Sequence, residues 1–174
     1  MNDEGNEQSS KRINLGSGKL KTFFVDHLNR IYSAKLHLIE RLPLLCHEAH
    51  FSDLQNAIAE TVQNVEKQIV RMEMIYALLD EIVAPANVLG LTSLVDDAFE
   101  AIQQQDGDAE LRDLSILFYL QNIESVEMAS FQILQMAAIK LKNPQVVQLL
   151  KENYEEAKAD RTLFLLISTK YITN

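Results

Sequence analysis

Two glutamates, Glu124 and Glu127, stand one helical turn apart within a run from Leu114 to Ile139 that contains no other charged residue. Residues three apart lie on the same face of a helix, so both carboxylates point toward the same neighbours. Iron and manganese take anionic oxygen ligands, and di-metal helical bundles place such glutamates on facing helices. A buried carboxylate without a partner is costly, and its pKa rises until it takes up a proton. We therefore expect a cation or a proton donor to face this pair.

The other helices offer few further metal ligands. The apolar seam of the first helix requires position 35 to face inward, and that residue is lysine. The second helix has Asn64 and Gln68, and neither is a convincing ligand for a hard cation. The Lys35 ammonium would supply the positive charge that a metal would otherwise bring. We therefore favour a metal-free polar core of ion pairs and hydrogen bonds, formed by Lys35, Asn64, Gln68, Glu124, Glu127 and Arg161.

The last helix leaves an alternative open. Its apolar stripe passes between Asp160 and Arg161, so either Glu156 and Asp160 or Ala157 and Arg161 face the core. In the first case the protein would bind iron or manganese, as a metal protein or a redox enzyme. No catalytic residue is assigned, because the sequence has no nucleotide-binding, serine-hydrolase or zinc-protease motif. The metal ligands of this alternative would be Glu124, Glu127, Glu156 and Asp160.

The elements that must position these residues are helices. Apolar residues recur at spacings of four and three from residue 19 to 48 and again from 52 to 79. Ser52 and Asp53 are expected to cap the second of these helices. A shorter amphipathic helix is predicted over residues 91 to 105, after a linker that contains Pro85.

Two more long helices follow, over residues 109 to 142 and from Pro144 to about residue 171, because proline is favoured at the first helical position. Since the helix from 109 to 142 is apolar on most sides, we expect it to be central. Short connections make the first and last pairs antiparallel, and the long middle connection lets the second and third long helices run the same way. The prediction is an all-α, ferritin-like four-helix bundle over residues 19 to 174, with a short crossover helix between helices 2 and 3, after a flexible polar tail over residues 1 to 18.

Composition limits the partners and the compartment. The chain has 174 residues, 47% of them hydrophobic, and a net charge of -9, so it has no basic surplus for nucleic acid or an anionic membrane. Cys46 is the only cysteine, which excludes an internal disulfide. The polar N-terminal segment does not resemble a secretory signal, and polar residues such as Gln121 and Gln132 make a membrane span unfavourable. We expect a soluble cytoplasmic protein.

Five segments resemble those of a known bacterial family, the YciE/YciF-type ferritin-like stress proteins. Residues 23 to 45, FFVDHLNRIYSAKLHLIERLPLL, are similar to the opening helix of that family, with its pattern F-x-D-x-L-x-x-[IL]-Y-x-A-E-x-x-L-x-x-x-L-P. The others are EKQIVRMEMIYALL (66 to 79), GLTSLVDDAFEAI (90 to 102), IESVEMASFQIL (123 to 134) and LLKENYEEAKADRTL (149 to 163).

The resemblance implies a ferritin-like bundle, a homodimer, a link to stress responses, and a di-metal site in typical members without a well-established enzyme activity. Glu124 and Glu127 fall on the third-helix acids of the family. Lys35 stands where the family has a glutamate, and Asn64 and Gln68 stand where it has the glutamate and histidine of E-T-x-x-H. The resemblance leaves both registers of the last helix open. Together with the inward-facing residues of the helices, the resemblance predicts that the di-metal site is degenerate. It also predicts that the protein has a structural or interaction role in stress adaptation.

Overall fold

A computed structural model describes residues 15–84, 90–105 and 107–173, and this part of the chain contains five helices and no strand. Most of the predicted tail, residues 1 to 18, lies outside the described residues, and the first helix already begins at Ser17. The helices are α1 (Ser17–Glu48), α2 (Ser52–Leu78), α3 (Leu91–Gln103), α4 (Ala109–Lys140) and α5 (Pro144–Thr173).

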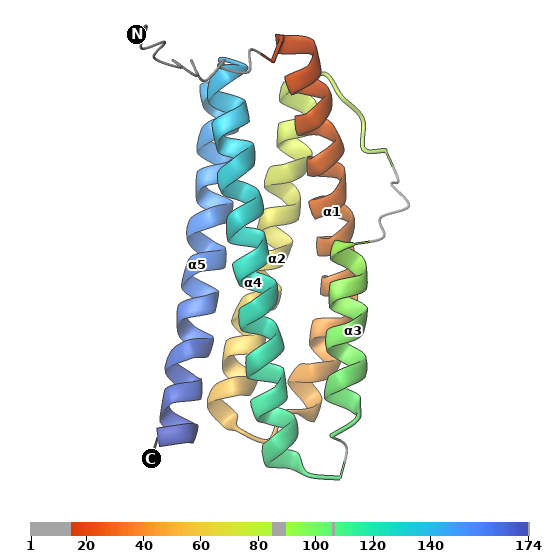
Figure 1. The fold of residues 1–174 in the computed structure, drawn as a ribbon. Coiled ribbons are helices and arrows are strands. Elements are labelled where there is room, and N and C mark those ends of the chain that lie inside the picture. Colours follow the sequence, from red (N-terminus) through yellow and green to blue (C-terminus); the bar gives the residue numbers. More distant parts are fainter. Residues whose placement is uncertain (1–14, 85–89, 106, 174) are drawn as a thin grey trace, which may run out of the picture.

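The four long helices form a bundle in which α1 contacts α2 and α4, and α5 contacts the same two helices from the opposite corner (Figure 1). Helices α2 and α4 run in the same direction, whereas α1 and α5 run against them (Figure 1). The short helix α3 crosses back along the bundle and packs on α1 and α4. The predicted ferritin-like four-helix bundle, with its crossover helix between the second and third long helices, is confirmed.

The core consists of two apolar clusters, one toward each end of the bundle. The first includes Leu38 of α1 and Phe164 of α5, and the second includes Tyr32 of α1 and Phe131 of α4. Lys35 lies on α1 between the two clusters and is fully buried, where the seam of this helix places it. The polar core is therefore a layer within the bundle, with hydrocarbon above and below it.

Helix α4 is not central, contrary to the expectation from its composition. It occupies one corner of the bundle, and its outer face is open to solvent, with Phe118 and Met136 each 61% exposed. A helix that is apolar on most sides is ordinarily covered on most sides. No helix in the described part of the chain has both the length and the hydropathy of a membrane span.

The caps of two helices differ from one another. Asp108 caps α4 as a short polar side chain should, accepting hydrogen bonds from the backbone N–H groups of Glu110 and Leu111. The prediction that Ser52 and Asp53 cap α2 is wrong. Both residues lie inside the helix, and the side chain of Phe51, which occupies the N-cap position, makes no capping hydrogen bond.

The connection between α1 and α2 is held instead by Asp113 of α4. This carboxylate is fully buried and accepts the backbone N–H of His50 at 2.8 Å and that of Phe51 at 2.5 Å. The neighbouring Arg112 donates to the carbonyl of Glu48 at the end of α1, at 2.7 Å. Helix α4 thus fixes the α1–α2 turn by forming hydrogen bonds with two backbone N–H groups and one backbone carbonyl of that turn.

We predict that Asp113→Ala lowers the free energy of unfolding by about 3 kcal/mol, because two backbone donors lose a charged acceptor in a buried place. Asp108→Ala is the matched control, since it removes an exposed cap worth about 1 kcal/mol. Urea unfolding of both variants measures the difference. Equal losses would show that Asp113 acts as no more than an ordinary cap.

Candidate functional site

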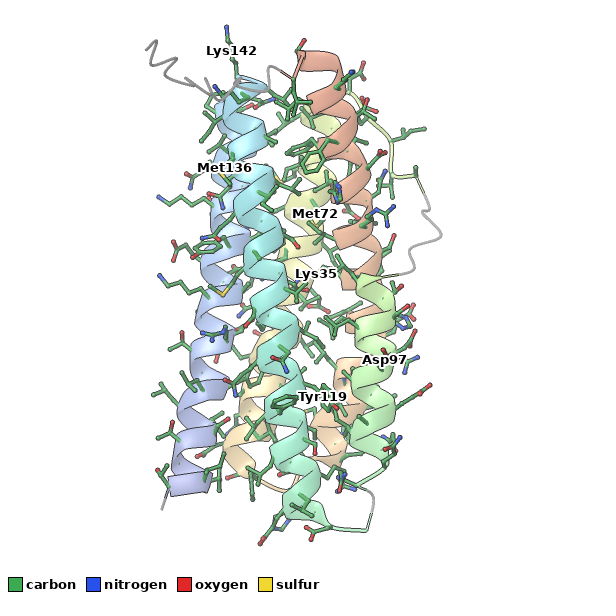
Figure 2. The ribbon with its side chains drawn as sticks, viewed as in Figure 1. Lys35, Met72, Asp97, Tyr119, Met136 and Lys142 are labelled. Carbon is green, nitrogen blue, oxygen red and sulfur yellow. The ribbon has the colours of Figure 1, made fainter. Side chains whose placement is uncertain are left out.

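A buried ion pair stands at the centre of the polar core. Lys35 is fully buried, and its Nζ contacts Oε2 of Glu127, which is only 6% exposed. The same Nζ lies 6.0 Å from the centre of the Phe131 ring, whose face attracts a cation. Figure 2 shows Lys35 inside the bundle at mid-height, between α1 and α4. The ammonium is thus held by one carboxylate and one aromatic ring.

Glu124 lies beside this ion pair and is not part of it. It is 1% exposed, and its Oε2 has no hydrogen-bond partner among the described residues. Burial and, second to it, the negative charge of Glu127 raise the pKa of Glu124 well above its ordinary value, against the opposing effect of Lys35. The protonated form of Glu124 is therefore favoured, and the core carries one fewer negative charge than its carboxyl groups suggest.

A third acid, Asp160, enters the core from α5. It is 2% exposed, and its Oδ1 accepts a hydrogen bond of 2.9 Å from Nδ2 of Asn64 on α2. Burial raises the pKa of Asp160 to about 6, although the Asn64 hydrogen bond and Lys35 both lower it. Ala157, one turn earlier, is also fully buried. The inward stripe of α5 therefore combines one residue from each of the two registers that the sequence left open.

Two other residues expected in this layer lie at its edge or outside it. Arg161 is partly buried, and its Nε donates to Oγ of Ser125 at 2.7 Å and not to the core acids. Glu156 faces α2 on the outside of the bundle. There the guanidinium of Arg71 donates hydrogen bonds to both carboxylate oxygens of Glu156, at 2.7 and 2.8 Å. The four acids of the metal alternative are thus not brought together, because Glu156 is engaged elsewhere.

The second helix adds polar atoms that the ion pair does not satisfy. Gln68 is fully buried, and neither atom of its amide has a partner among the described residues. Thr61, two turns earlier on the same seam, is equally buried, and its hydroxyl is likewise unpartnered there. Thr61 was not among the residues that the sequence predicted for the polar core. Its spacing of seven residues from Gln68 was the available signal.

This donor set does not fit a di-metal centre. Within the described ranges, no group of three or more His, Cys, Asp and Glu side chains is placed to hold a metal ion. The ammonium of Lys35 occupies an oxygen of Glu127, and a metal cation beside it would be repelled at close range. The remaining side chains at matching positions of α2, Asn64 and Gln68, are neutral amides. The side chains of this layer instead form an ion pair and hydrogen bonds between helices.

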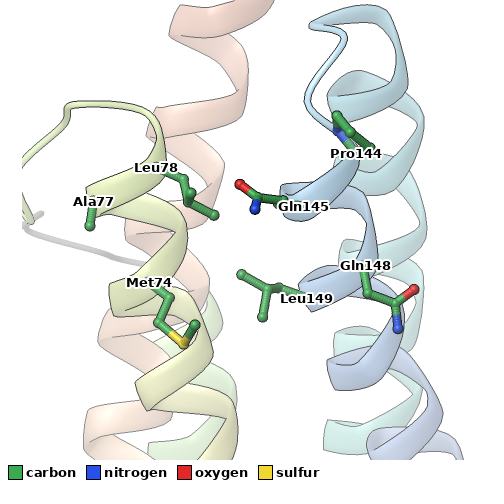
Figure 3. Close-up of a pocket in the computed structure, with 7 residues that line it drawn as sticks. All are labelled: Met74, Ala77, Leu78, Pro144, Gln145, Gln148 and Leu149. Atoms are coloured by element: carbon green, nitrogen blue, oxygen red, sulfur yellow. The ribbon is translucent and has the colours of Figure 1, made fainter.

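A surface groove lies away from this layer. A groove of about 650 Å³ runs between the end of α2 and the start of α5 (Figure 3). None of the residues that line it belongs to the polar core. The lining residues are Met74, Ala77, Leu78, Pro144, Gln145, Gln148 and Leu149.

Comparisons with known proteins place this geometry in a family. The chain is 26% identical over 141 residues to Protein YciF of Escherichia coli (strain K12), a match that covers 80% of this chain and 84% of that protein. The crystal structure of the E. coli stress protein YciF has the same fold, with a TM-score of 0.83 and 22% identity over 89% of this chain and 98% of that one.

The fold is shared by a second solved structure, YcfI of Rhodopseudomonas palustris, for which a structural role has been suggested. Its TM-score is 0.79, with 24% identity over 89% of this chain and 96% of that one. A profile of the family described as a domain of unknown function, DUF892, matches residues 19–171, nearly the whole length of the sequence. The chain belongs to the DUF892 family.

Proposed function

We propose that this protein is a ferritin-like bundle of stress adaptation, with a structural or interaction role, whose core is neutralised by Lys35 in place of iron or manganese. The observation that carries the proposal is the buried contact between Lys35 and Glu127. A lysine ammonium inside a bundle needs a carboxylate partner, and a carboxylate held in this way is not free to ligate a metal. Catalysis has no part in the proposal.

The stress and structural roles rest on relatives. YciF of E. coli is described as a stress protein, and a structural role has been suggested for YcfI of R. palustris. The chain shares their fold over most of its length, and its sequence identity to YciF extends over most of both chains. A structural role is also consistent with a polar layer that joins four helices without an open site.

A second candidate is a metal-binding protein or redox enzyme that uses the core carboxylates around one iron or manganese ion. The unpartnered oxygens Oε2 of Glu124 and Oδ2 of Asp160 favour it, because buried carboxylate oxygens attract cations. The candidate needs the Lys35 ammonium to leave Glu127 or lose its proton.

Metal analysis separates the two candidates. Protein purified without chelator should contain far less than one iron or manganese ion per chain, as measured by elemental analysis. A variant carrying Lys35→Glu, Asn64→Glu and Gln68→His is the positive control, because it exchanges the ammonium and two amides for metal ligands. One or more ions per parent chain would overturn the proposal and establish the second candidate.

Removing the ammonium tests whether the ion pair holds the core together. We expect Lys35→Met to lower the free energy of unfolding at pH 7 by about 3 to 5 kcal/mol, because it leaves the buried Glu127 carboxylate unpaired. Lys35 lowers the pKa of Glu124, so the variant should hold the proton of Glu124 more tightly and recover part of the loss as the pH falls. Lys151→Met, at an exposed lysine on α5, is the control and should change stability by less than about 0.5 kcal/mol. A pH-independent loss would contradict the ion-pair account.

Asp160 makes the stability of the folded protein depend on pH in a second way. Its pKa in the folded protein, about 6, lies above its ordinary value of 3.8, so the folded state holds its proton more tightly. The resulting stability is complete below pH 3.8 and is lost as the pH rises through 6, a change of about 3 kcal/mol.

Asp160→Asn keeps the shape and the acceptor for Asn64 but does not titrate. Between pH 4 and pH 7 the variant should therefore gain stability relative to the parent, by up to about 3 kcal/mol, in denaturant unfolding at each pH. Asp97→Asn changes an exposed acid on α3 and should give no such trend. A difference between Asp160→Asn and the parent that stays constant over this range would show that Asp160 titrates normally.

A further inference from the structure

The contact between Lys35 and Glu127 holds an amine and a carboxyl group together inside the bundle. The two residues come from α1 and α4 and are 92 positions apart in the sequence, and Nζ of Lys35 contacts Oε2 of Glu127. The side chain of Lys35 is fully buried, and that of Glu127 is 8% exposed. Apolar clusters cover the layer on both sides. Two groups that can react with each other are therefore in contact where little water reaches them.

Glu124 supplies a second carboxyl group beside this contact. It lies one turn before Glu127 on α4 and is 1% exposed. Burial raises the pKa of Glu124 most, followed by the charge of Glu127, and a hydrogen bond between the two side chains adds to the increase, whereas Lys35 opposes it. A protonated carboxyl group donates through one oxygen and accepts through the other, and Oε2 of Glu124 has no partner among the described residues. Glu124 is thus placed to carry a proton between its neighbours.

We propose that Lys35 and Glu127 join in an amide bond that links α1 covalently to α4, with Glu124 as the proton carrier. The inference rests on the proposed function, since both depend on the buried contact between Lys35 and Glu127. It also deepens that function. An amide carries no charge, so the cross-link makes the neutralisation of the core permanent and removes Glu127 as a possible metal ligand.

The atoms and protons of the step balance. The Lys35 ammonium first passes one proton to the Glu127 carboxylate, which gives a neutral amine and a neutral acid. The nitrogen lone pair then attacks Cδ of Glu127 and forms the C–N bond. As the C–O bond of the protonated oxygen breaks, Glu124 donates its proton to that oxygen and takes up a proton from the nitrogen at Oε2. One water leaves, nothing is oxidised or reduced, and Glu124 ends in its starting form.

Burial and proximity favour the amide over the ion pair. In water, an ammonium and a carboxylate are more stable than their amide, because both charges are well hydrated. In the core that hydration is lost, and keeping two charges there is costly. Well-oriented groups within one molecule also react as though each were present at about 10⁵ M or more. The apolar clusters keep out the water that would reverse the step by hydrolysis.

Other pairs of lysine and carboxylate in the described part of the chain lie under different conditions. Lys170 contacts Asp53, but the two side chains are 56% and 40% exposed. Lys21 pairs with Glu81 at 2.7 Å, and these side chains are 44% and 31% exposed. Water hydrates the charges of both pairs, so they should remain ion pairs. The contact of Lys170 with Asp53 is therefore an internal control that has the same reacting groups without the burial.

Mass spectrometry of the intact chain tests the proposal. Parent protein kept folded at neutral pH should be lighter than its sequence mass by one water. Trypsin should then release residues 31–41 and 113–140 as one branched peptide, because a Lys35 in amide linkage is not cleaved. Lys170 and Asp53 should appear in unlinked peptides. A parent that still has its full sequence mass after prolonged incubation would overturn the proposal.

Two variants test the parts of the site, and circular dichroism shows that each is folded. Lys35→Arg keeps the positive charge without the amine, so it should have its full sequence mass. Glu124→Gln keeps the size of the side chain but cannot carry the proton, and it should form the bond roughly a hundredfold more slowly or worse. Lys170→Arg is the matched control and should lose one water as the parent does. A loss of water that persists in Lys35→Arg would come from another site and overturn the proposal. Linkage of Glu124→Gln at the rate of the parent would overturn the role of Glu124.

Metal analysis and mass spectrometry give separate answers about the two proposals. A chain of full sequence mass that contains no metal would overturn the amide bond and leave the proposed function intact. A chain of full sequence mass that contains one iron or manganese ion would overturn both.

Discussion

The structure depends on one ion pair inside a helical bundle. Lys35 of α1 meets Glu127 of α4 in a layer that apolar clusters cover above and below. In such surroundings an unpaired ammonium or carboxylate costs several kcal/mol, so each charge can be buried only because the other is there. The same contact also determines how α1 and α4 are aligned, since a slip by one turn would separate the pair.

The rest of the polar layer adjusts to this pair by holding protons and neutral groups. Lys35 offsets Glu127, one of the three acids of this layer, and burial raises the pKa of the other two, Glu124 and Asp160. Amide and hydroxyl groups of α2 complete the layer without adding charge. A bundle that has a lysine and two amides at these positions stays close to neutral without a divalent ion, which is why we connect the sequence differences in α1 and α2 with the proposed loss of metal binding.

Helix α4 links the polar core to the outer surface. Its acids point inward and its apolar side chains occupy both the core and the solvent side, so the helix has no ordinary amphipathic face. The inward position of Glu127 is explained by its ion pair with Lys35.

The sequence by itself determined the helices, their connectivity and the inward position of Lys35, because these follow from a spacing of three and four along one chain. It also indicated the family through five segments that resemble segments of that family. Only the tertiary structure decided that Asp160 and not Glu156 enters the core, since the choice depends on Arg71 of another helix.

The same reason applies to the α1–α2 turn and to α4. Asp113 holds a turn far from it in sequence, which no local capping pattern could indicate. A helix that is apolar on most sides has only a weak periodicity to indicate which side faces the core, so the open corner position of α4 became visible only when its neighbours were in place. The spacing of residues along one helix shows which of them share a face, whereas contacts between helices depend on how several helices pack together.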